Sequence, residues 1–95
     1  MGKELLKLKD YSVFTFGSTS QALKAERVLK VAAADFLIMP TPREISTSCG
    51  LAVKVAPADQ GSCHHLLLSH NVQVESVYRV AEKDGKTRSE RVNDE

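Results

Sequence analysis

The feature that most constrains this chain is a strand–helix–strand pattern that occurs twice. Four short runs have the alternation, or the β-branched and aromatic content, that is typical of strands; they cover residues 11–16, 36–39, 51–55 and 72–80. One helical segment follows the first run and another follows the third. This order predicts an α+β fold, a ferredoxin-like sandwich (βαββαβ) in which two helices cover one face of a four-stranded antiparallel sheet. The run at 36–39 is apolar on both faces, so we expect it in the centre of the sheet.

The first helix is predicted over residues 20–33. Ser18, with Gln21 three residues later, has the form of a capping box, and the apolar residues that follow recur at helical spacing. The second helix is predicted over residues 58–70. Cys63 shares one face of it with Leu66 and Leu67, so we expect this thiol to be buried in the core and inert.

A polar segment, residues 40–51, separates the second and third strand-like runs. Thr41, followed by Pro42 and by Glu44, has the form of a helix start, whereas the hydroxyl residues 46–48 continue a helix poorly. We therefore expect one short turn and then an irregular stretch that presents Cys49. Gly50 has no Cβ, so a backbone or a ligand can approach the sulfur closely.

Cys49 is the residue of this segment that could carry chemistry. A thiolate is the reactive form of cysteine, and the guanidinium of Arg43, six residues earlier, would favour it. The other interpretation is a small, inert residue at a strand edge. The residues alone leave both interpretations open.

The segment resembles a known family. The stretch at 41–46, one intervening residue, and the stretch at 48–52 are similar to small bacterial domains described as selenium/sulfur carrier-like proteins. The similarity runs from about residue 11 to residue 78, and it places the family's cysteine on Cys49 and its arginine on Arg43. It implies a ferredoxin-like fold and a thiol that accepts and hands on a chalcogen atom. Sulfur carriers of the sulfurtransferase type have a Cys-Pro pair, whereas Gly50 follows the cysteine here.

Three functions of different classes follow from these residues. The first is a sulfur or selenium carrier in which Cys49 exchanges a chalcogen with donor and acceptor proteins. The second is a non-catalytic binding module, in which the polar segment holds an anionic ligand or a partner protein; its binding residues would be Arg43, Ser46, Thr47, Ser48 and Gly50. The third is a structural domain without chemistry. A carrier or binding protein is favoured over a turnover enzyme, and no cofactor is expected. No metal site is expected either, because no two histidines have the four-residue spacing that places two ligands on one face of a helix.

The composition limits the partners and the organisation. The chain has 95 residues and a net charge of +1, which favours one domain and gives no electrostatic case for binding nucleic acid. No apolar run is long enough to span a membrane and no secretory leader is evident, so we expect a cytoplasmic protein. We expect a lead-in at 1–10, the domain at 11–81 and a charged, disordered tail at 82–95. The edges of the sheet would be available for pairing with a second copy.

Overall fold

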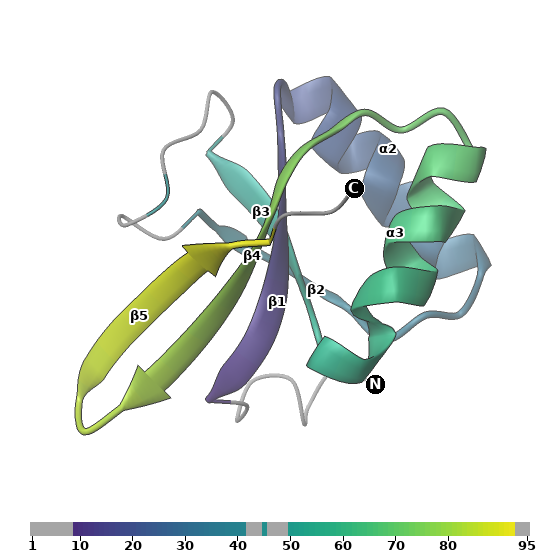
Figure 1. The fold of residues 1–95 in the computed structure, drawn as a ribbon. Helices are drawn as coiled ribbons and strands as arrows, with labels where there is room; N and C mark the ends of the chain where they lie inside the picture. Colours follow the sequence, from purple (N-terminus) through teal and green to yellow (C-terminus); the bar gives the residue numbers. More distant parts are fainter. Residues whose placement is uncertain (1–8, 42–44, 46–49, 93–95) are drawn as a thin grey trace.

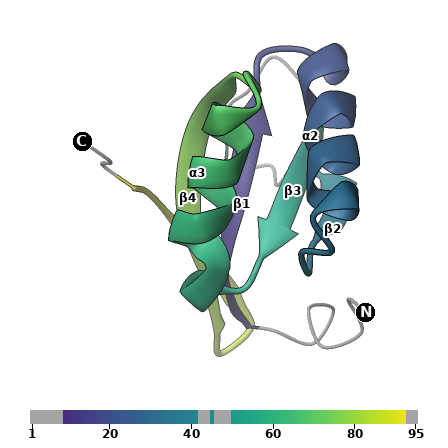
Figure 2. The same ribbon diagram turned by 90° about the vertical axis from the view of Figure 1, so that its right-hand side faces the viewer.

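The computed structural model describes residues 9–41, 45 and 50–92. Its elements, in chain order, are β1 (Asp10–Phe16), α2 (Thr19–Val31), β2 (Leu37–Pro40), β3 (Leu51–Val55), the 3-10 turn η1 (Pro57–Asp59), α3 (Gln60–Ser69), β4 (Val74–Lys83) and β5 (Lys86–Arg91). The strands form one sheet in the order β2-β3-β1-β4-β5, and every neighbouring pair is antiparallel. Both helices lie on one face of this sheet (Figures 1 and 2). The predicted class, α+β with two helices and an antiparallel sheet, is confirmed.

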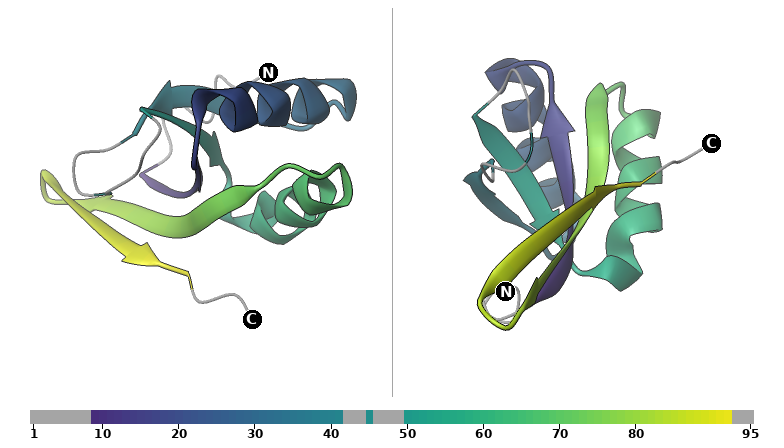
Figure 3. Two further views of the ribbon diagram at one scale, coloured as in Figure 1. Left: turned by 90° about the horizontal axis from the view of Figure 1, so that it is seen from above. Right: turned by 60° about the vertical axis from the view of Figure 1, so that its left-hand side comes forward.

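The number of strands is a correction. The sheet has five strands instead of four, so the order is βαββαββ, with β5 added after the predicted elements. The disordered tail predicted from residue 82 is wrong for 82–91, because these residues complete β4 and form β5. Asp84 and Gly85, with φ of 54° and 76°, make the two-residue turn between them, as in a type I′ hairpin. The hairpin extends beyond the part of the sheet that the helices cover (Figure 3). Residues 93–95 lie outside the described residues.

The position of the second strand is also a correction. β2 pairs only with β3 among the described strands and is therefore an edge strand, not a central one. Its residues are nevertheless apolar on both sides because both faces of the sheet are covered. Ile38 packs against the core under the helices, whereas Met39 packs against a second cluster on the opposite face. The apolar run thus reflects contacts on both faces of the sheet and does not indicate a central place in it.

The helix α2 begins at the predicted cap. Ser18 Oγ accepts a hydrogen bond from the amide of Gln21 at 3.3 Å. The side chain of Gln21 makes a tertiary contact, because its Oε1 accepts from the amide of Gln73 at 2.8 Å. This bond ties the start of α2 to the connection that leads into β4.

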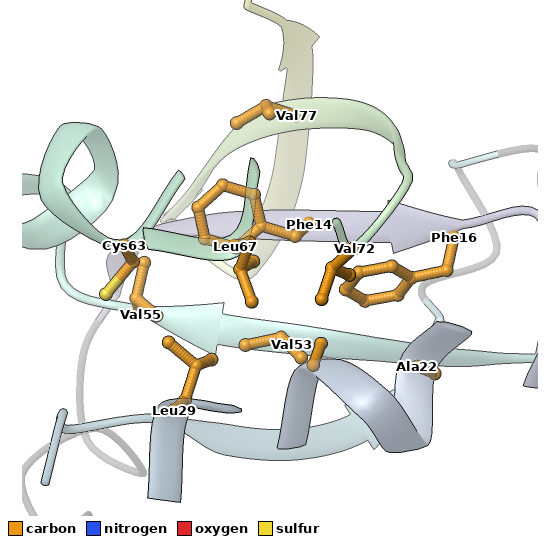
Figure 4. Close-up of a cluster of buried hydrophobic side chains, with 11 residues drawn as sticks. Phe14, Phe16, Ala22, Leu29, Val53, Val55, Cys63, Leu67, Val72 and Val77 are labelled. Carbon is orange, nitrogen blue, oxygen red and sulfur yellow. The ribbon is translucent and has the colours of Figure 1, made fainter. Parts of the chain in front are cut away.

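The main core lies between the helices and the sheet (Figure 4). Its buried residues come from all of these elements and are Phe14, Phe16, Ala22, Ala25, Leu29, Val53, Val55, Cys63, Leu67, Val72 and Val77. Cys63 is only 5% exposed, so its predicted burial is confirmed. The sulfur occupies a place that an apolar side chain would fill equally well.

Candidate functional site

The predicted site falls largely outside the described residues. Cys49 and Arg43 lie outside them, and so do Ser46, Thr47 and Ser48. Of the segment at 40–51, the structure describes the two ends, residues 40–41 and 50–51, and one residue between them, Ile45. The geometry of the site is therefore built from these residues and from the sheet around them.

The two ends of the segment meet. The amide of Thr41 donates to the carbonyl of Gly50 at 2.9 Å, directly beyond the β2–β3 pair of Pro40 and Leu51. This bond extends the ladder by one step, so the segment leaves and rejoins the sheet at one point. Gly50 is exposed, and a Cβ placed on it would meet no described atom within 4 Å. Among the described residues, none therefore crowds the position that follows Cys49 in the sequence.

Ile45 attaches the middle of the segment to the sheet. Its side chain is 4% exposed and belongs to a buried cluster on the face opposite the helices. The other buried members of this second-face cluster are Tyr11, Val13, Ala52 and Val80. A sheet of this kind commonly leaves that face to water. Here the side chain of Ile45 covers part of that face, and this contact connects the segment that contains Cys49 to the sheet.

Lys54 is a charged residue whose burial the alternation of the strand did not reveal. It lies on the same face of β3 as Ala52. The structure places it in the covered face, with 8% of the residue exposed and its Nζ 4.1 Å from the centroid of the Tyr11 ring. This is the geometry of a cation–π contact.

The electrostatics of Lys54 follow from this burial. Loss of water around the ammonium lowers the pKa of Lys54, and the carboxylate of Glu82 partly opposes the change. A cation in a dry environment is weakly screened, so its attraction for a nearby anion is stronger than at the surface. The sheet face to which Ile45 binds therefore carries a fixed positive group.

Cys63 has the opposite character. Burial raises the pKa of the Cys63 thiol, and the carboxylates of Asp59 and Asp35 raise it further. A buried thiol that holds its proton is a poor nucleophile. The chain has two cysteines, so Cys49 is the one that remains as a candidate for thiol chemistry.

One of the three histidines contributes to packing. The ring of the half-buried His64 lies against Phe14, with 5.7 Å between the ring centroids. Among residues 9–41, 45 and 50–92, no three histidine, cysteine or acidic side chains gather as metal ligands would. Within the same ranges, no helix has the length and apolar character needed to cross a membrane.

Comparison with known proteins gives one match. Residues 10–79 match the model of a family described as "Putative Se/S carrier protein-like". The chain belongs to this family. The match spans most of the chain and includes Cys49, Arg43 and the rest of the polar segment, which confirms the resemblance found in the sequence. It ends before β5. No curated protein and no solved structure matches the chain.

Proposed function

We propose that this protein is a sulfur or selenium carrier whose working group is the thiol of Cys49. Membership of the carrier-like family supports the general function. The observation that supports this particular residue is the state of Cys63. A carrier needs an accessible thiolate, and Cys63 is buried with a raised pKa, so it meets neither requirement.

The proposed reaction has two steps, loading and delivery. Each step moves one chalcogen atom, first from a donor to Cys49 and then from Cys49 to an acceptor. The Cys49 thiolate attacks the outer sulfur of a donor persulfide, R–S–SH. A bond forms between Cys49 Sγ and that sulfur, the S–S bond of the donor breaks, and the donor leaves as a thiolate, R–S⁻. In delivery, a thiolate of the acceptor protein attacks the same outer sulfur and Cys49 is released as thiolate. A selenium atom in the outer position follows the same steps, and neither direction needs an external oxidant or reductant.

One feature of the described residues and one feature of the sequence suit this role. The bond between Thr41 and Gly50 fixes these two positions of the segment, while Gly50 is exposed and no described atom would crowd a Cβ placed on it. Arg43 adds a positive group within the same segment as Cys49. Positive charge near a thiol favours its anionic form.

Loading by a small persulfide tests the proposal. The parent protein, Cys49→Ser and Cys63→Ser are each incubated with glutathione persulfide, desalted and weighed intact by mass spectrometry. We expect the parent and Cys63→Ser to gain the mass of one sulfur atom, and Cys49→Ser to gain none. Circular dichroism of the three proteins checks that each is folded.

Two results would contradict the carrier function. If Cys49→Ser gained as much mass as the parent, the chalcogen would be bound by a residue other than Cys49. Failure of the parent to load, with sulfate or phosphate bound equally well by the parent and Cys49→Ser, would favour the binding module in which Arg43 and the hydroxyl residues hold an anion. Replacing Arg43 with alanine distinguishes the roles further, because it should slow loading in the carrier and abolish anion binding in the module.

A further inference from the structure

The outer edge of β5 has a regular set of backbone groups that point away from the sheet. Lys83 is opposite Lys86 across the turn, and the amide of Val92 donates to the carbonyl of Val77 at 2.7 Å. In an antiparallel pair, bonded positions alternate along the strand, so residues 86, 88, 90 and 92 direct their N–H and C=O groups toward β4. Residues 87, 89 and 91 therefore direct theirs outward. No described strand pairs with that side (Figure 1).

The side chains of β5 add a charge pattern to this edge. Its sequence is Lys-Thr-Arg-Ser-Glu-Arg, in which Glu90 is the single acidic residue. A purely basic edge would repel a second copy in every alignment, which is how many proteins protect their edge strands. Glu90 removes this general repulsion, because β5 of an antiparallel second copy can be aligned so that basic residues lie opposite acidic ones.

Only one two-fold alignment satisfies both the backbone and the charges. A residue whose backbone groups point outward must lie opposite such a residue of the second copy. The two-fold axis that relates the copies therefore passes through a residue position of β5 and not between two positions. A two-fold axis at position 88 or 91 would place an arginine opposite the same arginine of the second copy. An axis at 90 would place Glu90 opposite Glu90, which is also repulsive. An axis at 87 sets Lys86 opposite Arg88. An axis at Ser89 avoids every such like-charge pair.

We infer that β5 pairs with β5 of a second copy around Ser89, and that this joins two five-stranded sheets into one. The backbone bonds come from residues 87, 89 and 91 of each copy. Arg88 lies opposite Glu90 of the second copy, and the two-fold axis produces this pair twice. Each Glu90 then lies between two arginines, because Arg79 of its own chain is its neighbour in β4. Arg79 is itself held by Asp10, with nitrogen–oxygen distances of 3.0 and 3.1 Å.

The interface has the properties of a weak, reversible contact. It consists of one strand from each copy, so it is smaller than a standard stable interface, and association should depend on concentration over about 10 μM to 1 mM. Its ion pairs are exposed, so added salt should weaken it. The edge lies beyond the part of the chain that matches the family, so the pairing is independent of the proposed carrier function.

Sedimentation velocity over that concentration range tests the inference with the full chain. The parent should shift from monomer to dimer as its concentration rises. Arg88→Glu sets two pairs of glutamates opposite each other and Glu90→Arg sets two pairs of arginines, so each variant alone should dimerise at least about tenfold more weakly. An equimolar mixture of the two variants restores two attractive pairs and should dimerise again. Arg27→Glu, an equal charge change on α2, should behave as the parent does.

Three results would overturn the inference. They are a parent that stays monomeric throughout the range, single variants that associate as well as the parent, and a mixture that stays monomeric. Ser89→Pro gives an independent check, because it removes an outward N–H and leaves the bonds to β4 in place. This variant should be a folded monomer by circular dichroism and sedimentation, and a dimeric Ser89→Pro would also contradict the pairing.

Discussion

Replacing Lys54 with methionine should change stability little at neutral pH, even though the residue is buried. Methionine keeps most of the apolar stem of the side chain and removes the ammonium. The lost cation–π contact with Tyr11 is worth about 0.5–2 kcal/mol, but the cost of holding a charge away from water is lost with it. We expect the two effects to offset to within about 1 kcal/mol.

Replacing Lys54 with alanine should be more harmful. This change removes about three buried methylene groups, which contribute about 0.8 kcal/mol each, so we expect a loss of about 2 kcal/mol. The comparison of the two variants separates packing of the stem from attraction by the charge. Urea unfolding followed by circular dichroism measures both, with linear extrapolation to zero denaturant.

The pH dependence of the same variants gives the sign of the electrostatic effect. Burial lowers the pKa of Lys54, so the unfolded chain holds this proton to a higher pH than the folded chain does. Relative to Lys54→Met, the free energy of unfolding of the parent should therefore rise as the pH increases from the folded-state pKa toward 10.5. A parent that loses stability relative to the variant over this range, or a methionine variant as unstable as the alanine variant, would show that the ammonium is a net stabilising group.

Three further predictions concern the thiols, the core and the hairpin. Mild alkylation of the native protein should label Cys49 quickly and Cys63 slowly, as peptide mapping would show; equal rates would mean that burial does not protect Cys63. Leu67→Ala should reduce the free energy of unfolding by about 3 kcal/mol, whereas Leu68→Ala, at a position 54% exposed, should change it by less than about 0.5 kcal/mol; similar urea midpoints would contradict the packing. Gly85→Ala should cost about 1–2 kcal/mol through its positive φ and speed hydrogen exchange in β5, and unchanged exchange would argue against the turn.

Local signals in the sequence predicted the two helices well. The capping residue Ser18 and the apolar positions of α2 depend on neighbours within a few residues, and the structure confirms both. The burial of Cys63 also followed from helical spacing within α3. Each of these features is decided by interactions that a short window of sequence contains.

The hairpin was missed although its signal is present. Asp84-Gly85 is a dipeptide that favours a two-residue turn, and it lies between residues that can pair. The density of charge from residue 82 onward instead suggested disorder. Composition was a poor guide here because β5 gains its backbone bonds from β4, and an edge strand needs few apolar side chains of its own.

The position of Lys54 could not be obtained from alternation. A period of two assigns a residue to a face of the sheet, but it does not say what covers that face. Burial of Lys54 depends on Tyr11 in a neighbouring strand and on the second-face cluster to which Ile45 belongs, and these come from distant parts of the chain. The place of β2 at the edge depends in the same way on the register of the whole sheet.

Ile45 couples the polar segment to the stability of the sheet. Moving its side chain from the second-face cluster into water would cost about 1.5–3 kcal/mol, so the attached arrangement is favoured by about ten- to a hundredfold over a detached one. Any partner that needs the segment detached must supply this free energy through its own contacts. By the same linkage, a modification of Cys49 that alters the attachment of Ile45 changes the melting temperature of the whole domain, so thermal unfolding becomes a readout of the loaded state.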